Sequence, residues 1–266
     1  MRYVLGVDAA WTNSEPSGVA LLKVDNHNII ETVKLARSYE EFYKGNIDWN
    51  TFISGSKPDY SMLLKYSYSQ GWDIDLVALD IPLSPEVINR RRSADQLIST
   101  NYGGRGASTH SPNKDRPGEI SVDIFQQLTE ALFIWNGDVS KSKSFIEVYP
   151  HTSIIELFKY DYRLKYKVQK RNKFWPEDTP AQRRLNIIAN LNELRSKLIS
   201  FIPNVADMLH PLVKDKFYSI KYLKSYEDVL DALVAALTGC FYVAGNVKGY
   251  GDNSSTIWVP QLRSVY

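Results

Sequence analysis

The fold of this chain depends first on residues 3–11, which read Tyr3-Val4-Leu5-Gly6-Val7-Asp8-Ala9-Ala10-Trp11. Five residues suited to a buried strand lead directly into Asp8, and a second strand-like segment follows at residues 18–22 after a polar turn. A carboxylate at the mouth of a core strand is costly to remove from water unless it meets a cation or several hydrogen-bond donors. Asp8 therefore needs a partner.

The composition is that of an ordinary soluble globular protein. The 266 residues are 44% hydrophobic and 23% charged, and the net charge of +2 permits an anionic partner without demanding one. The single Cys240 excludes an intramolecular disulfide and a cysteine-based zinc site. No apolar segment approaches the roughly 20 residues needed to cross a bilayer, and we see no signal peptide. We expect a cytoplasmic protein with no membrane partner.

Five segments have the apolar character of strands, at residues 3–8, 18–24, 28–36, 75–82 and 144–150. The short connections between the first three predict an antiparallel meander, and the continuous apolar run of the fourth is typical of a strand covered on both faces. Helices are expected at residues 85–101, 122–135, 151–158, 180–201 and 225–245. Because there is no internal repeat or clear linker, we predict a single domain, 1–266, with insertions at about 39–71 and 159–215.

Three of the predicted strands end in or near an acidic residue, namely Asp8, Asp80 and Glu147. The carboxyl ends of strands are the usual place for a site in open α/β sheets. Each acid has an alternative structural role, capping a helix or closing a turn, and for Glu147 the two readings are equally open.

The last helix carries two more carboxylates. Residues 225–228 have the form of a capping box, with Ser225 as the cap, and this accounts for Asp228. It does not account for Asp231, which lies one turn further along, inside an apolar run and on the same helix face. Because like charges this close are unfavourable without a cation, we predict a Mg²⁺ or Mn²⁺ site. Carboxylates from several elements can hold two such ions about 4 Å apart for in-line displacement at a phosphodiester.

Basic residues gather in three places: the start of the helix after residue 85, the loop at 102–118 and the segment at 159–184. We expect them to hold a nucleic-acid backbone together, although each one alone is better explained as a residue of a solvated surface. The candidates are Arg90, Arg91, Arg105, Lys114, Arg116, Lys167 and Arg183.

The order of these elements resembles the RNase H-like fold, and the late helix with its Asp-x-x-Asp spacing resembles that of RuvC-type resolvases. More specifically, five stretches are similar to the motifs of the domain of unknown function 429 family, the predicted RNase H-fold nucleases. They are residues 6–11 (GVDAAW), 79–83 (LDIPL), the helix start at 90–95, 146–150 (IEVYP) and 231–236 (DALVAA).

The resemblance implies an α/β fold with a mixed five-stranded sheet, three antiparallel strands followed by two parallel ones, flanked by helices. It also implies a nuclease dependent on Mg²⁺ or Mn²⁺, with Asp8, Asp80 and Asp231 as metal ligands, Asp228 as a fourth and Glu147 as an accessory catalytic residue. DNA or RNA would be the partner, and a homodimer is an open alternative by analogy with resolvases.

Two other functions remain open. An actin-like or sugar-kinase-type phosphotransferase shares the three-strand beginning, but the turn after Asp8 lacks the Gly and Ser or Thr pattern that cradles phosphates. A non-catalytic nucleic-acid-binding module would use some of the 17 tyrosines and six tryptophans as stacking surfaces. For a mobile general base we favour His110 over His151, for which a backbone hydrogen bond at a helix start is the simpler reading.

Overall fold

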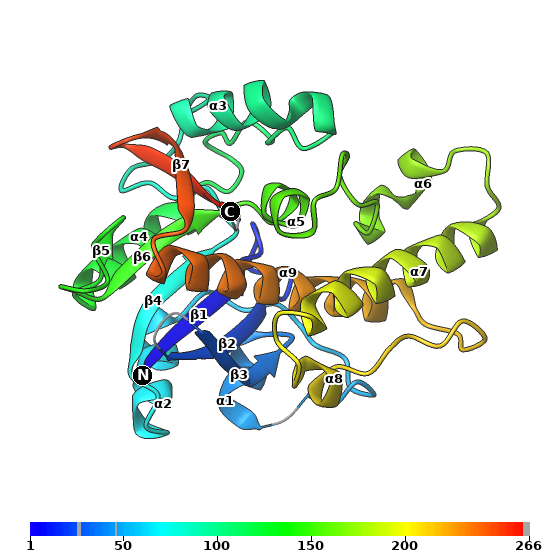
Figure 1. Ribbon diagram of the computed structural model, residues 1–266, viewed down its shortest axis with the longest axis horizontal. Coiled ribbons are helices and arrows are strands. Elements are labelled where there is room, and N and C mark those ends of the chain that lie inside the picture. The colour runs from blue at the N-terminus through cyan, green and yellow to red at the C-terminus, as the bar shows by residue number, and fades with distance from the viewer. Residues whose placement is uncertain (26–27, 46, 263–266) are drawn as a thin grey trace.

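A mixed sheet forms the centre of the computed structural model, which describes residues 1–25, 28–45 and 47–262. Its strands are ordered β3-β2-β1-β4-β6-β8-β7, with β5 beside β6 (Figure 1). The bounds are β1 Arg2–Asp8, β2 Gly18–Asp25, β3 Asn28–Ala36, β4 Ile74–Leu79, β5 Ile134–Trp135, β6 Ser144–Val148, β7 Val247–Asp252 and β8 Ser255–Pro260.

The five strands expected from the sequence are present, but the expected total of five is wrong. Strands β1, β2 and β3 pair antiparallel, and β4 and β6 continue the sheet parallel to β1. Within the described residues the sheet has eight strands, because β5 and the hairpin β7–β8 extend it. Strand β5 has only two residues, and β7 contains two glycines and an aspartate, which are depleted in strands. These segments therefore carry little strand signal.

The helices and short 3₁₀ turns fall between and after these strands. They are α1 Tyr39–Lys44, α2 Tyr60–Ser69, α3 Ser93–Tyr102, η1 Gly103–Arg105, α4 Glu119–Glu130, α5 Pro150–Phe158, η2 Val168–Lys170, α6 Arg171–Phe174, α7 Pro180–Ile199, α8 Val205–Met208 and α9 Ile220–Val243. Nowhere in the described ranges is a helix both long and apolar enough to cross a membrane.

Three expected helices differ from those observed; the one expected at 225–245 begins at Ile220 and is described with the site. The helix expected at 85–101 begins only at Ser93, since Arg92 stays extended and pairs with buried carboxylates. The helix expected at 122–135 ends at Glu130, and Leu132 has a positive φ of 66°, which is incompatible with continuing the helix.

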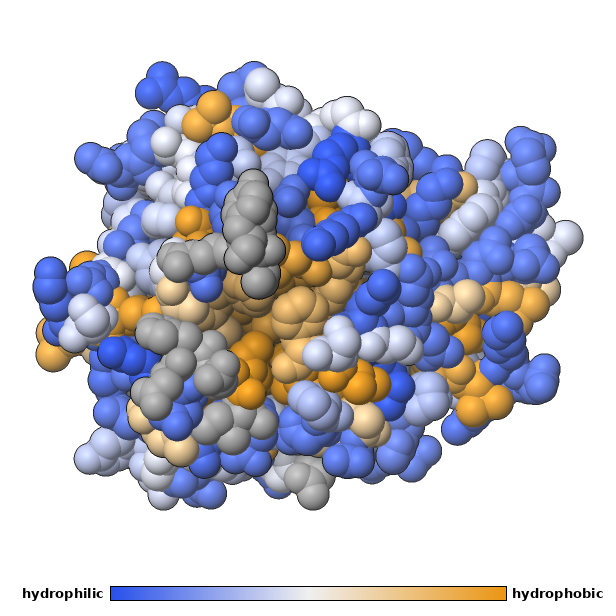
Figure 2. All heavy atoms as spheres, viewed as in Figure 1, coloured by the Kyte–Doolittle hydropathy of each residue, from blue (hydrophilic) through white to orange (hydrophobic). Residues whose placement is uncertain are grey.

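Helices cover both faces of the sheet. One face packs against α5, α7 and α9, and its core contains Val4, Ala20 and Ala78. Side chains that alternate with these, such as Leu5 and Leu21, belong to a second core against α1, α2 and α4. In Figure 1, α9 crosses the central strands, and Figure 2 shows hydrophobic residues gathered over that region with hydrophilic ones around them. The central strands are therefore apolar on both faces, as their continuous hydrophobic runs indicate.

Helix α9 lies unusually close to β1 because of Gly6. A Cβ atom at this position would lie 2.2 Å from the carbonyl oxygen of Ala232 and 2.3 Å from the amide nitrogen of Ala236. Both clashing atoms belong to the helix backbone, which cannot rotate out of the way as a flexible side chain can. A glycine in β1 and small residues on α9 thus set the distance between the helix and the sheet.

We predict that Gly6→Ala lowers the free energy of unfolding by about 3 kcal/mol, because the added methyl group must push α9 away from the sheet. Gly104→Ala is the matched control, since a Cβ there meets no atom within 4 Å. Urea titration followed by circular dichroism measures both. A Gly6→Ala protein as stable as Gly104→Ala would contradict this packing.

Candidate functional site

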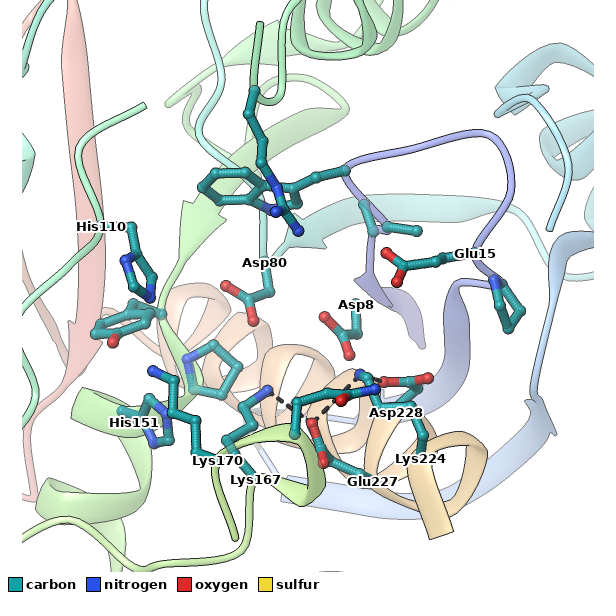
Figure 3. A pocket seen from close by; sticks show the side chains of 18 of the residues that line it. Asp8, Glu15, Asp80, His110, His151, Lys167, Lys170, Lys224, Glu227 and Asp228 are labelled. Atoms are coloured by element: carbon teal, nitrogen blue, oxygen red, sulfur yellow. Dashed lines mark hydrogen bonds and ion pairs between the residues drawn. The ribbon is translucent and has the colours of Figure 1, made fainter. Parts of the chain in front are cut away.

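Asp8 and Asp80 lie side by side at the carboxyl ends of two neighbouring parallel strands. Val7 of β1 pairs with Leu79 of β4, and the Asp80 amide donates a hydrogen bond to the Val7 carbonyl oxygen at 2.9 Å. The next residue on each strand is therefore an aspartate, and the strand spacing of about 4.8 Å separates their backbones. The structure brings these two predicted residues together, and both carboxylates face a common cavity (Figure 3).

Asp228 joins them because of a second glycine. Gly18 pairs with Asp8 across β1 and β2, and a Cβ at Gly18 would lie 2.1 Å from the Asp228 carbonyl oxygen. The missing side chain lets the α9 backbone rest on the sheet edge beside Asp8. The carboxylate of Asp228 reaches the same cavity.

The start of α9 differs from the capping box expected at Ser225. The helix begins five residues earlier, at Ile220, where the Ser219 hydroxyl accepts a hydrogen bond from the Tyr222 amide at 3.1 Å. Lys224 therefore lies inside the helix, one turn before Asp228, and the two form an ion pair. Asp228 is held by this lysine in the helix interior, so the capping account of Asp228 is wrong.

Asp231 is fully buried, and described residues already contact both of its oxygens. The Tyr166 hydroxyl donates a hydrogen bond to Oδ1 at 2.6 Å, and the Lys167 ammonium pairs with Oδ2. Asp231 does not line the cavity. The tyrosine and the lysine both come from the segment between α5 and η2, so this insertion neutralises a carboxylate deep under the site.

Glu227 is a third acid of the last helix, and sequence reasoning missed it. Its carboxylate lies 3.4 Å from the Lys167 ammonium and 3.3 Å from that of Lys224, and it accepts a hydrogen bond from the Val168 amide at 2.6 Å. Its place was nonetheless readable from sequence spacing, because Glu227 precedes Asp231 by four positions and follows Lys224 by three. Starting the helix at Ser225 hid this pattern by leaving Lys224 outside it.

The pKa values follow from burial and from these partners. Burial raises the pKa of Asp80 well above its usual range, and the neighbouring Asp8 raises it further. Burial likewise raises the pKa of Asp231 to about 6, against the lowering effect of Lys167. Burial alone would lower the pKa of Lys167, but Asp231, Tyr166 and Glu227 together outweigh it and hold that pKa well above the ordinary value. The lysine thus stays charged under the cavity.

The cavity has a volume of about 530 Å³ and differs in charge from one end to the other. Figure 3 places Asp8, Glu15 and Asp228 on one side, Asp80 in the middle, and His110, His151 and Lys170 on the other side. Arg116 and Trp11 also line it, with the Arg116 guanidinium 5.9 Å from the Trp11 ring centroid. A volume of this size suits a small molecule or one unit of a polymer.

Glu147 lies outside this cavity and has structural partners. It is buried, its Oε2 accepts a hydrogen bond from the Leu83 amide at 2.9 Å, and both oxygens bind the Arg92 guanidinium at 2.7 Å. Arg92 also binds Asp95 at the start of α3. The ion triad of Arg92, Asp95 and Glu147 fixes the loop that follows Asp80. The accessory catalytic role of Glu147 stays a prediction.

Of the seven basic candidates, the structure places two at the cavity, Arg116 and Lys167. Arg91 bonds to Ser111 and the Asp95 carbonyl, Arg105 pairs with Glu156, and Arg183 bonds to backbone carbonyls. Arg90 and Lys114 are exposed elsewhere on the surface. The sequence could not separate these groups, because only the tertiary packing decides which of them reach the cavity.

The residues described by the structure include no group of three or more His, Cys, Asp or Glu side chains placed to hold one metal ion. The four carboxylates predicted as ligands are therefore divided. Asp228 and Asp231 pair with lysines, whereas no described residue forms an ion pair with Asp8 or Asp80.

The fold and the site define an α/β protein with a charged cavity at the carboxyl edge of its central parallel strands. The chain belongs to the family described as "Protein of unknown function (DUF429)", which matches residues 60–256. Comparison with curated proteins and with solved structures yields no match.

We predict that Lys167→Met destabilises the protein by about 3 kcal/mol, because Asp231 loses its cation and Glu227 loses one of its two while both stay buried. Lys165→Met is the matched control, since Lys165 lies two residues away, outside the cavity. Thermal and urea unfolding measure the difference. Equal stability of the two variants would contradict the assigned charge pairing.

We also predict that Arg92→Met lowers the free energy of unfolding by about 3–5 kcal/mol, because it leaves two buried carboxylates without their shared cation. Arg90→Met, two positions earlier and exposed, should be nearly neutral. The same urea titrations apply. A mild effect at Arg92 would show that the triad does not hold the loop after Asp80.

Proposed function

We propose that this protein is a divalent-metal-dependent phosphodiesterase that hydrolyses nucleic acid at the cavity of Asp8 and Asp80. The observation that carries the proposal is the pairing of these two carboxylates on adjacent strands without an ion-pair partner among the described residues. Two neighbouring carboxylates repel each other when both are ionised, and a shared cation removes that repulsion. Asp8 therefore gains the partner that its place at a strand mouth requires.

The donor set fits Mg²⁺ or Mn²⁺. Both prefer oxygen ligands, and Mg²⁺ is commonly bound by one or two carboxylates together with waters and substrate phosphate oxygens. Such an ion lowers the pKa of bound water and offsets charge on the phosphate. We place it at Asp8 and Asp80, and this is a smaller set than the four-carboxylate, two-ion site predicted from the sequence.

The lysines explain why one ion suffices. Lys224 pairs with Asp228, and Lys167 lies between Asp231 and Glu227. Each ammonium supplies positive charge that a second ion would otherwise have to bring. The two lysines offset most of the negative charge of the three α9 carboxylates, Glu227, Asp228 and Asp231, so that Asp8 and Asp80 are the pair left for the cation.

The strand order supports the assignment of an RNase H-like fold. The sequence β3-β2-β1-β4-β6, with the first three strands antiparallel, is the arrangement expected of an RNase H-like core, to which β8 and β7 would be additions. We propose that the protein has this fold and is a nuclease. Its partner would be DNA or RNA, and its location the cytoplasm. The buried free thiol of Cys240 is compatible with a reducing compartment.

The test is hydrolysis of fluorescent single-stranded and duplex DNA and RNA oligonucleotides in Mn²⁺. We expect cleavage that EDTA stops and that falls about 100-fold or more in Asp8→Asn and in Asp80→Asn, because each change removes a charge that the cation needs. Asp215→Asn, at an exposed position far from the cavity lining, is the control.

Circular dichroism of each variant verifies folding before its rate is compared. Full activity in a folded Asp80→Asn protein would refute the site. An absence of cleavage across all four substrate types, with wild-type protein and Mn²⁺, would refute the nuclease itself.

A further inference from the structure

The hydrogen bonding of His151 fixes where its ring proton lies. The Arg163 guanidinium contacts His151 Nε2 at 2.6 Å. A guanidinium can only donate, so Nε2 must accept and a neutral ring must carry its proton on Nδ1. Burial lowers the pKa of His151 well below its usual range, and Arg163 and Lys167 lower it further, so the ring is neutral. His151 is thus a donor at Nδ1 and cannot act as a base through Nε2.

That donor has no acceptor among the described residues. His151 is 97% buried and lines the cavity, yet within residues 1–25, 28–45 and 47–262 Nδ1 has no hydrogen-bond partner. A buried donor without a partner is rare and indicates a water or ligand that completes it. Because His151 lines the cavity, we place the missing acceptor there.

The start of α5 adds a second donor at the same place. Tyr149 makes no side-chain cap, Pro150 has no N–H, and the amides of Thr152 and Ser153 bond to the Tyr149 carbonyl. The His151 amide is the remaining N–H of the first turn, and no described residue accepts a hydrogen bond from it. It lies at the positive end of the helix dipole, where an anion is stabilised.

Cations surround this position. Lys170 and Arg116 line the cavity, and Arg163 lies behind His151; within the described residues none of the three forms an ion pair with a carboxylate. Burial lowers the pKa of Lys170 to about 8, and repulsion from Arg163, Lys167 and Lys173 contributes. Glu227 opposes this effect but is itself bound by two lysines. The cationic end of the cavity therefore lacks an anion.

We propose that this end of the cavity is a phosphate-binding subsite, in which a phosphate group accepts hydrogen bonds from the His151 ring and amide and from the Lys170 ammonium. Phosphate oxygens accept from all of these donors and offset the local positive charge. The inference rests on the proposed function in one respect, that the phosphate belongs to a nucleic-acid substrate whose ester bond lies at Asp8 and Asp80.

The first experiment is calorimetric titration with inorganic phosphate in EDTA, so that no divalent ion takes part. We expect one phosphate per chain, and binding about tenfold weaker in Lys170→Gln, which removes the charge from a partly exposed tip. Lys165→Gln, outside the cavity, is the matched control. No binding, or equal binding in both variants, would overturn the subsite.

The second experiment reads the His151 ring by ¹⁵N-resolved NMR. We expect the Nδ1–H form in the free protein and a shift of that proton when phosphate is added. An Nε2–H form, or a signal that phosphate leaves unchanged, would overturn it. Because both measurements omit the metal, phosphate binding without Mn²⁺-dependent cleavage would refute the proposed function and support the subsite. Mn²⁺-dependent cleavage that Lys170→Gln leaves unchanged, without any phosphate binding, would refute the subsite and support the proposed function.

A pair of tetrathymidylates identifies the source of the phosphate. One carries a 5′-phosphate and the other ends in a hydroxyl. If Lys170→Gln weakens only the first, the subsite binds a terminal monoester. If it weakens both, the subsite binds an internal diester.

Discussion

The Lys167 ammonium holds the two most deeply buried acids of α9, Asp231 and Glu227, and the rest of the site depends on this pairing. Two unit charges 4 Å apart interact by about 4 kcal/mol at the effective dielectric constant of a protein surface. Without such a partner, a buried carboxylate would take up a proton or destabilise the fold. The pairing also ties the segment between α5 and η2 to the last helix, so the insertion contributes directly to the floor of the cavity.

The pairing divides the charges of the site into two groups. The carboxylates of the helix pair with Lys167 and Lys224, whereas Asp8 and Asp80 at the strand ends form no ion pair with any described residue, and it is there that we propose a cation. Gly6 and Gly18 make this division possible, because they let α9 approach the sheet until Asp228 lies beside Asp8. At the other end of the cavity the cations are in excess, which favours a substrate with more than one negative group.

Much of this arrangement could be predicted from the sequence, and the remainder could not for identifiable reasons. The apolar runs before Asp8 and Asp80 identify both residues as strand ends, and adjacent parallel strands bring such ends together. The contact between Lys167 and Asp231 joins residues 64 positions apart, and no local pattern reports it. The start of α9 was misplaced because Ser219 and Ser225 are both acceptable caps, and only tertiary packing selects Ser219. The hairpin β7–β8 was not expected because β7 contains two glycines and an aspartate, and its place beside β6 depends on pairing with residues more than 100 positions earlier in the chain.

The most direct measurement of the central claim is the anomalous scattering of manganese in crystals of the protein soaked in Mn²⁺. We expect a single peak between the carboxylates of Asp8 and Asp80, with Lys167 still paired to Asp231 and Lys224 to Asp228. A peak coordinated by Asp228 or Asp231 with the lysines displaced would contradict it. So would the absence of any peak at a Mn²⁺ concentration that supports hydrolysis.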